Sequence, residues 1–379
     1  MSATGTIDPV LLSVAAVLPS PEYSTEELLA AGRGRLSDQL VEMLTGLGVQ
    51  KRHSVLSNYP AVLFDHAEPV LDIETADLAV AATRQCLEKS GVAPESIGLV
   101  LGVTSAPGRL LPSLVCDVIA RMPEIPRTVS NLSIEYMGCS AMAKAVETAR
   151  WYLSCNPGKH VLVCFAEAIT PMSPPLPEFY SHFSEVPASQ RQRTVDAMHG
   201  FLFADAAVAM MFGAHGEGPV FGPVVNLTNE QPSDAELGTV PDGGSDIPVV
   251  HGRRLYTLSP DVTPRGAHYA EQTVEQLLND EACALDSAAD ASALLLHTGS
   301  MRILDGLCDR FGVAHDAGAV ASSYRVLREY GNTLGCSVPL MVAEPTRRAP
   351  GQALLVAFGL SFSCGAFTMT MPDGGWSPE

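Results

Sequence analysis

The sequence repeats itself at an offset of 193 residues, and this repeat constrains the fold more than any other feature. Residues 157–165, PGKHVLVCF, align without gaps with residues 350–358, PGQALLVAF. At the same offset the apolar run that ends at Thr104 aligns with SALLLH, which ends at His297, and Cys139 falls on Asn332. A Pro-Gly pair before an apolar run is common, so one match is within coincidence. Three matches at one offset predict a duplicated unit with a pseudo-twofold axis.

Buried strands alternate with amphipathic helices along both copies. Apolar runs at 97–105 and 160–168 predict strands, and the helical spacing of apolar residues predicts helices over 75–92 and 141–153. This alternation is typical of an α/β protein whose sheet is covered on both faces. We therefore predict an α/β fold with two related halves.

The halves are expected to be an N-terminal one over 1–225, which carries the Cys, and a C-terminal one over 226–379, which carries the His and Asn. A polar stretch over 226–247 separates them. Residues 171–200 contain five prolines and many polar residues, which predicts a long irregular excursion of the kind used as a lid or binding loop.

Composition excludes several classes of function. The 379 residues carry a formal net charge of −19, so a nucleic-acid partner and a polybasic membrane patch are not expected. The longest apolar runs, such as VLLSVAAVL, are too short to span a bilayer, and that run lacks the basic flank of a signal peptide. Nine scattered cysteines without a CxxC pair predict a reducing cytoplasm, no disulfide framework and no metal site. Any anionic partner, such as a coenzyme A phosphate or an acidic carrier protein, would need a local basic spot.

Three residues are candidates for catalysis at a centre that both halves share. Cys139 and Asn332 are expected at equivalent helix N-termini, and His297 at the carboxyl end of a strand, where ligands of α/β sheets gather. The partial positive charge of a helix N-terminus favours a thiolate, which could carry an acyl group. Backbone N–H groups near Cys139 would hold the oxyanion. His297 and Asn332 would donate hydrogen bonds to a second thioester and stabilise the enolate formed when a malonyl-like substrate loses carbon dioxide. This chemistry needs no metal and no organic cofactor.

Each of these residues also has an ordinary structural interpretation. A free Cys is commonly an inert core residue, a buried His is often satisfied by the core, and Asn commonly caps a helix or forms a turn. A cysteine hydrolase would use the same residue types, but the papain-type Cys signature is absent and the repeat has no place in that fold. An acyltransferase acting on an alcohol or amine and a catalytically silent partner subunit stay open as alternatives.

Several segments resemble the thiolase-like condensing enzymes, especially the type III polyketide synthases of the chalcone synthase family. YMGCSAMAKAVETARWYLSCNPGKHVLVCFAEAIT is similar to the family's nucleophile segment, LLLHTGSMRILDGL to its His segment and VLREYGNTLGCSVPLMV to its Asn segment. FADAAVAMMFG is similar to its phenylalanine-led strand, and GVTSAPGRLLPSL matches in character. The resemblance covers roughly residues 45–370.

The resemblance implies a duplicated thiolase-like αβαβα layered fold, a homodimer, and coenzyme A or carrier-protein thioesters as substrates. By position, Cys139 is then the acylated nucleophile and His297 and Asn332 are the decarboxylation pair. Phe203 falls where the family has a gatekeeper aromatic between entry tunnel and cavity. The expected function is acyl loading on Cys139 and decarboxylative Claisen extension with malonyl-CoA, in specialised metabolism.

Four departures from the family pattern weigh against iterated extension and cyclisation. HTGS replaces HPGG after His297, and AFGLS replaces the C-terminal GFGPG loop. Arg254 and Leu255 stand where a second gatekeeper Phe is expected. The basic coenzyme-binding cluster is reduced to QKRH at 50–53, in which Lys51 and Arg52 are expected to be a solvated charge pair rather than phosphate ligands. YGNT and the C-terminal end are more similar to β-ketoacyl-carrier-protein synthase III, so one condensation, or acyl transfer to a non-malonyl acceptor, is the alternative function.

Overall fold

The computed structural model describes residues 6–176, 185–247, 249, 253–359 and 362–378. Its central feature is a mixed sheet built from β1 (Val10–Val17), β4 (Ile97–Thr104), β5 (Ser130–Glu135), β6 (His160–Glu167), β7 (Ala206–Gly213), β8 (Val220–Thr228), β11 (Leu294–Leu296), β12 (Gly351–Gly359) and β13 (Ser363–Met371). The strand order in this sheet is β11-β12-β13-β8-β1-β7-β6-β4-β5.

The strand order is the same when read outward in either direction from the centre. β1 and β8 meet there, antiparallel, at Val10 and Val220. On one side β7 and then β6 follow as antiparallel neighbours and β4 is parallel to β6. On the other side β13 and then β12 follow as antiparallel neighbours and β11 is parallel to β12. The duplication predicted from the sequence is therefore confirmed, with β5 as an additional edge strand of the first half. β8 crosses residue 225, and the division into 1–225 and 226–379 stays a prediction.

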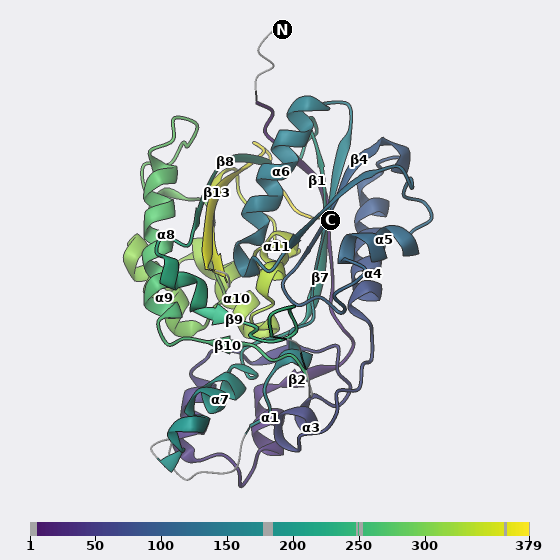
Figure 1. Cartoon of the computed structure of the whole chain (residues 1–379). Coiled ribbons are helices and arrows are strands. Elements are labelled where there is room, and N and C mark those ends of the chain that lie inside the picture. Colours follow the sequence, from purple (N-terminus) through teal and green to yellow (C-terminus); the bar gives the residue numbers. More distant parts are fainter. Residues whose placement is uncertain (1–5, 177–184, 248, 250–252, 360–361, 379) are drawn as a thin grey trace.

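Helices form three layers around the sheet (Figure 1). α4 (Thr75–Ser90) and α5 (Leu114–Arg121) cover the outer face of the first half, and α8 (Val262–Leu278), packed on α9 (Met301–Phe311), covers that of the second. α6 (Ala141–Cys155) contacts β4 and β6 of one half and β8 and β13 of the other. α11 (Ser337–Ala343) contacts β1 and β7 as well as β11. These two helices form the middle layer, so the predicted αβαβα arrangement is confirmed.

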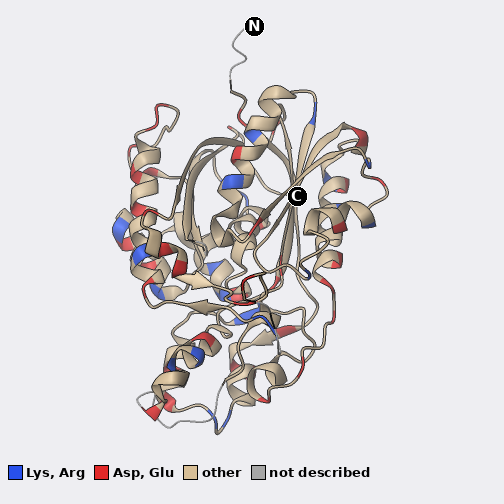
Figure 2. Cartoon of the chain, viewed as in Figure 1, with Lys and Arg blue, Asp and Glu red and all other residues tan. Residues whose placement is uncertain are grey.

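The remaining elements lie mostly beyond one end of the sheet, where Figure 1 shows α1, α3 and α7 together. They are α1 (Thr25–Ala31), α2 (Asp38–Thr45), α3 (Tyr59–Phe64), α7 (Ala188–His199), α10 (Ala321–Tyr330), and the short strands β2 (Glu22–Ser24), β3 (Lys51–His53), β9 (Gly238–Thr239) and β10 (Thr257–Leu258). Asp and Glu residues are spread over the outer helices and loops (Figure 2). Within the described ranges, no helix combines the length and the apolar character needed to cross a membrane.

The predicted strands and helices are found close to their expected ends. α4 ends at Ser90 because Gly91 takes the left-handed conformation, with φ of 62°, that few other residues adopt easily. α6 ends where Asn156 begins the predicted Asn-Pro-Gly turn. The expected irregular excursion over 171–200 is wrong in its second part, because residues 188–199 form α7. After Pro187 this segment has neither proline nor glycine, so nothing prevents helix formation. Residues 177–184 of the excursion lie outside the described residues.

Candidate active site

Cys139 lies in a sharp turn between β5 and α6. It is the middle residue of a short 3₁₀ segment, Gly138–Ser140, and is 2% exposed. Tyr136 and Gly138 have φ of 62° and 53°, so the chain reverses direction in front of the cysteine. The Gly138 N–H donates to Ser105 Oγ at 2.7 Å, which ties this turn to the end of β4. The predicted position of the thiol, at a strand-to-helix junction, is observed.

Asn332 lies against Cys139. The thiol donates to Asn332 Oδ1 at 3.7 Å, across 193 positions of sequence. Oδ1 also accepts the N–H of Leu334 at 3.0 Å, which leaves Nδ2 as the end of the carboxamide that can donate to a substrate. The backbone of Asn332 is fixed by two hydrogen bonds, from its N–H to Leu202 O at 2.9 Å and from Ala204 N–H to its own carbonyl at 3.0 Å.

His297 directly follows β11 and is 5% exposed. Its ring packs on Phe358, with 4.3 Å between the ring centroids. Gly359, the residue after Phe358, lies so close to the nucleophile turn that a Cβ added to it would be 2.5 Å from Cys139 N. The end of β12 therefore connects the imidazole to the cysteine, and the structure brings the three predicted residues into one region.

The electrostatics of this region keep both titratable groups neutral. Burial lowers the pKa of His297 to about 3, and its Nδ1 has no hydrogen-bond partner among the described residues. Burial, followed by the charge of nearby Glu167, raises the pKa of Cys139 well above its ordinary value, and only its own backbone N–H opposes this. Desolvation thus outweighs the helix start, and the resting group is a thiol rather than the predicted thiolate.

Glu167 is a residue of this region that the sequence did not reveal. It is fully buried at the end of β6, and its carboxyl group accepts the N–H groups of Ser105 at 2.8 Å, Ala106 at 3.0 Å and Gly335 at 3.1 Å. Burial raises its pKa to about 8. Because Gly335 belongs to the second half, one carboxyl group joins the two repeats beside the thiol. A glutamate that ends an otherwise apolar strand, HVLVCFAE, is the signal that could have found it.

The structure corrects the register of the repeat around Asn332. A second Gly-Cys-Ser, at 335–337, leads into α11 as the first, at 138–140, leads into α6. The structural counterpart of Cys139 is therefore Cys336, which is fully buried and donates from Sγ to Ala206 O at 3.3 Å. Asn332 lies in the turn before the helix and not at the equivalent helix start. The offset of 193 aligned the strands correctly but missed the extra residues in this turn.

Phe203, the predicted gatekeeper, is 3% exposed and forms an isolated backbone bridge with Asn332. Its ring meets Tyr256 edge to face, with 5.0 Å between centroids. Tyr256 is fully buried and stands two residues after Arg254, so an aromatic partner exists slightly later than expected. The role of Phe203 as a gatekeeper stays a prediction. Residues 360–361 of the departing AFGLS loop lie outside the described residues.

The basic pair at 51–52 is not a solvated charge pair. Arg52 is fully buried and donates to Phe201 O at 2.9 Å and to Thr25 Oγ1 at 2.6 Å. Lys51 forms an ion pair with Glu22 at 3.1 Å. Arg52 is therefore part of the scaffold, because its hydrogen bonds offset the cost of burying its charge.

Two cavities flank the loop that follows β4. The first, of about 560 Å³, is lined in part by Ala168, Met172 and Arg253. The second, of about 420 Å³, is lined in part by Ser105, which bonds to the nucleophile turn. Arg254 lines both cavities. Among the described residues, no group of three or more His, Cys, Asp or Glu could hold a metal ion.

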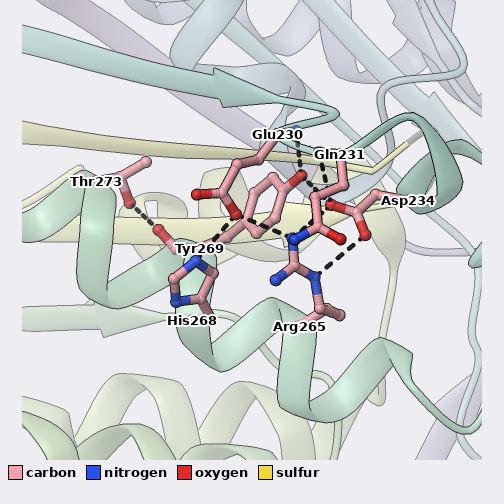
Figure 3. Close-up of polar contacts among 7 residues, drawn as sticks. All are labelled: Glu230, Gln231, Asp234, Arg265, His268, Tyr269 and Thr273. Atoms are coloured by element: carbon pink, nitrogen blue, oxygen red, sulfur yellow. Dashed lines mark hydrogen bonds and ion pairs between the residues drawn. The ribbon is translucent and has the colours of Figure 1, made fainter.

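A polar cluster links the outer helix α8 to the segment that begins at Glu230 (Figure 3). Arg265 of α8 pairs with Asp234 at 2.6 Å and with Glu230 at 2.9 Å. Tyr269 also donates to Asp234, at 2.7 Å, and His268 contacts Glu230 at 2.9 Å. These contacts attach residues 230–236 to α8, and the chain continues from there into Gly238–Gly244 along the second cavity.

Comparison with known proteins identifies two family models in the chain. Residues 58–173 match the FAE1/type III polyketide synthase-like family, and residues 285–371 match the C-terminal domain of 3-oxoacyl-(acyl-carrier-protein) synthase III. A β-ketoacyl-(acyl-carrier-protein) synthase III from Oleidesulfovibrio alaskensis is 25% identical over 303 residues, which is 77% of this chain and 83% of that protein.

Solved structures with these names share the fold over nearly the whole chain. The type III polyketide synthase domain of a type I/III hybrid from Dictyostelium has a TM-score of 0.76 at 19% identity, over 96% of this chain and 99% of that one. A priming β-ketosynthase from a polyketide pathway has a TM-score of 0.73 at 23% identity, over 100% and 99%. These findings support an enzyme with acyl-transferring activity, and the chain is similar to the thiolase-like condensing enzymes, both to β-ketoacyl synthase III and to the type III polyketide synthases.

Proposed function

We propose that the enzyme loads an acyl group from a thioester onto Cys139 and joins it to a malonyl thioester in one decarboxylative Claisen condensation. The observation that carries this proposal is the contact between Cys139 Sγ and the side chain of Asn332, at 3.7 Å, made by residues from opposite halves of the duplicated fold. The synthase III names of the sequence relatives support a single condensation rather than the iterated extension implied by the chalcone synthase resemblance.

The first step is acyl transfer. Because the resting thiol is protonated, its proton must leave as the sulfur attacks, and the sulfur of the departing donor is the group that finally takes it. The sulfur–carbon bond forms, the bond from that carbon to the donor's sulfur breaks, and the donor thiol departs with the proton. The N–H of Cys139, at the start of α6, is placed to stabilise the oxyanion.

The second step is condensation. The malonyl thioester loses carbon dioxide, and its carbonyl oxygen becomes an enolate oxygen that accepts hydrogen bonds from His297 and from Asn332 Nδ2. The enolate carbon attacks the acyl carbonyl, the carbon–sulfur bond to Cys139 breaks, and the sulfur leaves as a thiolate that takes one proton from water. A neutral imidazole suits this step, because it keeps an N–H donor without placing a fixed positive charge in the core.

The substrates and assembly follow from the same proposal. Acyl-CoA or acyl-carrier-protein and malonyl-CoA are the expected partners, with no organic cofactor, in the cytoplasm. A homodimer is supported by β5, an edge strand whose Leu132 is 48% exposed, and by Leu111 in the loop after β4, which is 84% exposed. Exposed apolar side chains along a free strand edge favour pairing with a second chain.

The test is incubation with a panel of acyl thioesters and malonyl-CoA. Intact mass should show one acyl group on the protein, lost in Cys139→Ala and kept in the matched variant Cys116→Ala, which changes an exposed cysteine. Carbon dioxide should be released, and the product should carry one added two-carbon unit. Several added units would support polyketide extension, and an ester or amide without carbon dioxide release would support transfer to a non-malonyl acceptor. Absence of acylation at Cys139 by every donor would refute the proposal.

A further inference from the structure

We propose that Arg254 is a specificity residue that binds an anionic group on the thioester donor. This inference rests on the proposed function, since it concerns which donors reach Cys139. It starts from the position of Arg254, which lines two cavities, the second of which is also lined by Ser105 beside the nucleophile turn.

Arg254 is held in place by its stem and not by its charged end. The aliphatic part lies on Gly243, whose φ of 96° suits glycine and where an added Cβ would collide with the Arg254 side chain. No hydrogen bond or ion pair joins the Arg254 guanidinium to another residue that the structure describes. The side chain is half-buried, so an unpaired guanidinium at this place has its five donors available for a ligand.

The first cavity is lined by more basic than acidic residues, although the protein as a whole is acidic. Three arginines line it, against two carboxylates. The carboxylates of Glu74 and Asp117 both pair with Arg109, at 3.5 Å. Arg253 donates to Pro171 O at 3.1 Å, and neither Arg253 nor Arg254 pairs with a carboxylate of the residues that the structure describes. The net charge of −19 would repel an anionic donor elsewhere, so this pair supplies the local basic spot.

The second cavity adds a complementary group. Asp242 lines it, and its Oδ1 is buried without a hydrogen-bond partner among the described residues. A buried carboxylate oxygen without a partner is unfavourable unless a ligand donates to it. The ligand is therefore expected to place an anionic group at Arg254 and an N–H or O–H within reach of Asp242.

Two anionic groups share the chemistry that a guanidinium binds in a bidentate manner: a carboxylate at the far end of the acyl chain, and the phosphate of a phosphopantetheine arm. Tyr256 connects Arg254 to the candidate site, since its ring meets Phe203 and Phe203 is bridged to Asn332. Arg254 stands where an aromatic gatekeeper was expected. It therefore gives the cavity a basic lining residue, which favours anionic donors, in place of an apolar one.

The experiment compares four donors on the full-length enzyme. A monocarboxylic acyl group and a dicarboxylic half-thioester of equal length are each presented on N-acetylcysteamine, which has no phosphate, and on phosphopantetheine. The rate of Cys139 acylation is followed by intact mass for the wild type, Arg254→Gln and Asp242→Asn. Arg302→Gln, at an exposed site on α9, is the matched control.

Loss of Arg254 should lower acylation roughly 10- to 100-fold for donors that carry the recognised anion, the range of a charge-assisted hydrogen bond, and leave the others unchanged. A loss confined to dicarboxylic donors assigns the acyl carboxylate, and one confined to phosphopantetheine donors assigns the phosphate. Asp242→Asn should lower acylation of the same donors by a few-fold, because the N–H or O–H of the ligand then meets a neutral acceptor in place of a carboxylate.

Equal acylation of all four donors by wild type and Arg254→Gln would overturn the inference while leaving the proposed function intact. Failure of all four donors to acylate wild-type Cys139 would instead count against the proposed function. An equal loss on every donor in Arg254→Gln, with Arg302→Gln unaffected, would show a structural role and also overturn the inference.

Discussion

Cys139 and Asn332 meet at 3.7 Å although they belong to different repeats of the fold. The sulfur donates to the same oxygen that accepts the Leu334 N–H, so the carboxamide is oriented before any substrate binds. This relationship assigns separate tasks to the two residues, and each task can be removed alone.

Replacing Asn332 with Ala should leave acylation and remove condensation. The thiol keeps its place, but the enolate loses one of two donors, which typically costs about 10²- to 10³-fold in rate. Acyl mass on Cys139 and carbon dioxide release, measured on the same sample, separate the two steps. Normal condensation by Asn332→Ala would show that its carboxamide is not a donor to the enolate.

Condensation from a preloaded acyl-enzyme should show no titration of His297 between about pH 5.5 and 8. Burial lowers the pKa of this imidazole to about 3, so its protonation state does not change across that range. The measurement is single-turnover carbon dioxide release against pH, with substitution by Gln, which keeps an N–H donor, expected to retain more activity than substitution by Ala. A step near pH 6.5 in the wild type that is absent from His297→Gln would contradict the expected neutral donor.

Replacing Glu167 with Gln should flatten the pH dependence of stability. Burial raises the pKa of this carboxyl to about 8 from an ordinary 4.5, so between these values the native state holds a proton that the unfolded state releases. The free energy of unfolding contributed by Glu167 is therefore present below about pH 4.5 and is lost as the pH rises through 8. Urea midpoints at pH 5 and pH 8.5 should fall more in the wild type than in Glu167→Gln. Parallel falls would show that the carboxyl titrates normally.

Replacing Gly359 with Ala should slow acylation at least ~10-fold and lower stability by about 1–3 kcal/mol, as overpacking does. The new Cβ would lie 2.5 Å from Cys139 N and 2.9 Å from Gly138 C, and both are backbone atoms that hold the nucleophile turn. Gly158→Ala is the control, because its Cβ would meet nothing within 4 Å. Thermal melts and acylation rates report the two effects, and equal behaviour of both variants would show that the turn can shift freely.

Replacing Phe203 with Leu should destabilise the fold by about 1 kcal/mol, since the edge-to-face pair with Tyr256 is lost. Condensation should fall more than acylation, because repacking around residue 203 shifts the backbone that is bridged to Asn332. Comparing the two rates in one variant tests this order. A changed acyl-length preference with unchanged condensation would instead support the gatekeeper role.

The parts of the fold set by local apolar patterning were predictable from the sequence. The apolar runs that became β4 and β6 and the helical spacing that became α4 and α6 depend on burial alone, and their equivalence between halves followed from the repeat. Cys139 and Asn332 could be paired because the repeat linked two distant segments. Their electrostatics could not be predicted, because burial of the thiol and the nearness of Glu167 depend on the completed fold.

Residues that act through long-range backbone contacts were missed or misassigned. Glu167 gains its role from amides of two other segments, one of them 168 positions away. Arg52 was predicted to be solvated, yet it is fully buried and donates to the carbonyl oxygen of Phe201, 149 positions away. Tyr256 was missed because gatekeeper spacing varies by a residue or two in a loop, where no periodicity fixes the register.

The mirrored strand order has one further consequence for how this enzyme can change. Because Cys139 lies in one half and Asn332 in the other, the reaction depends on how the two halves pack together and not on either half alone. A substitution in α6 or α11, the helices between the two halves, can therefore change the turnover rate without touching a substrate, because it shifts one half relative to the other.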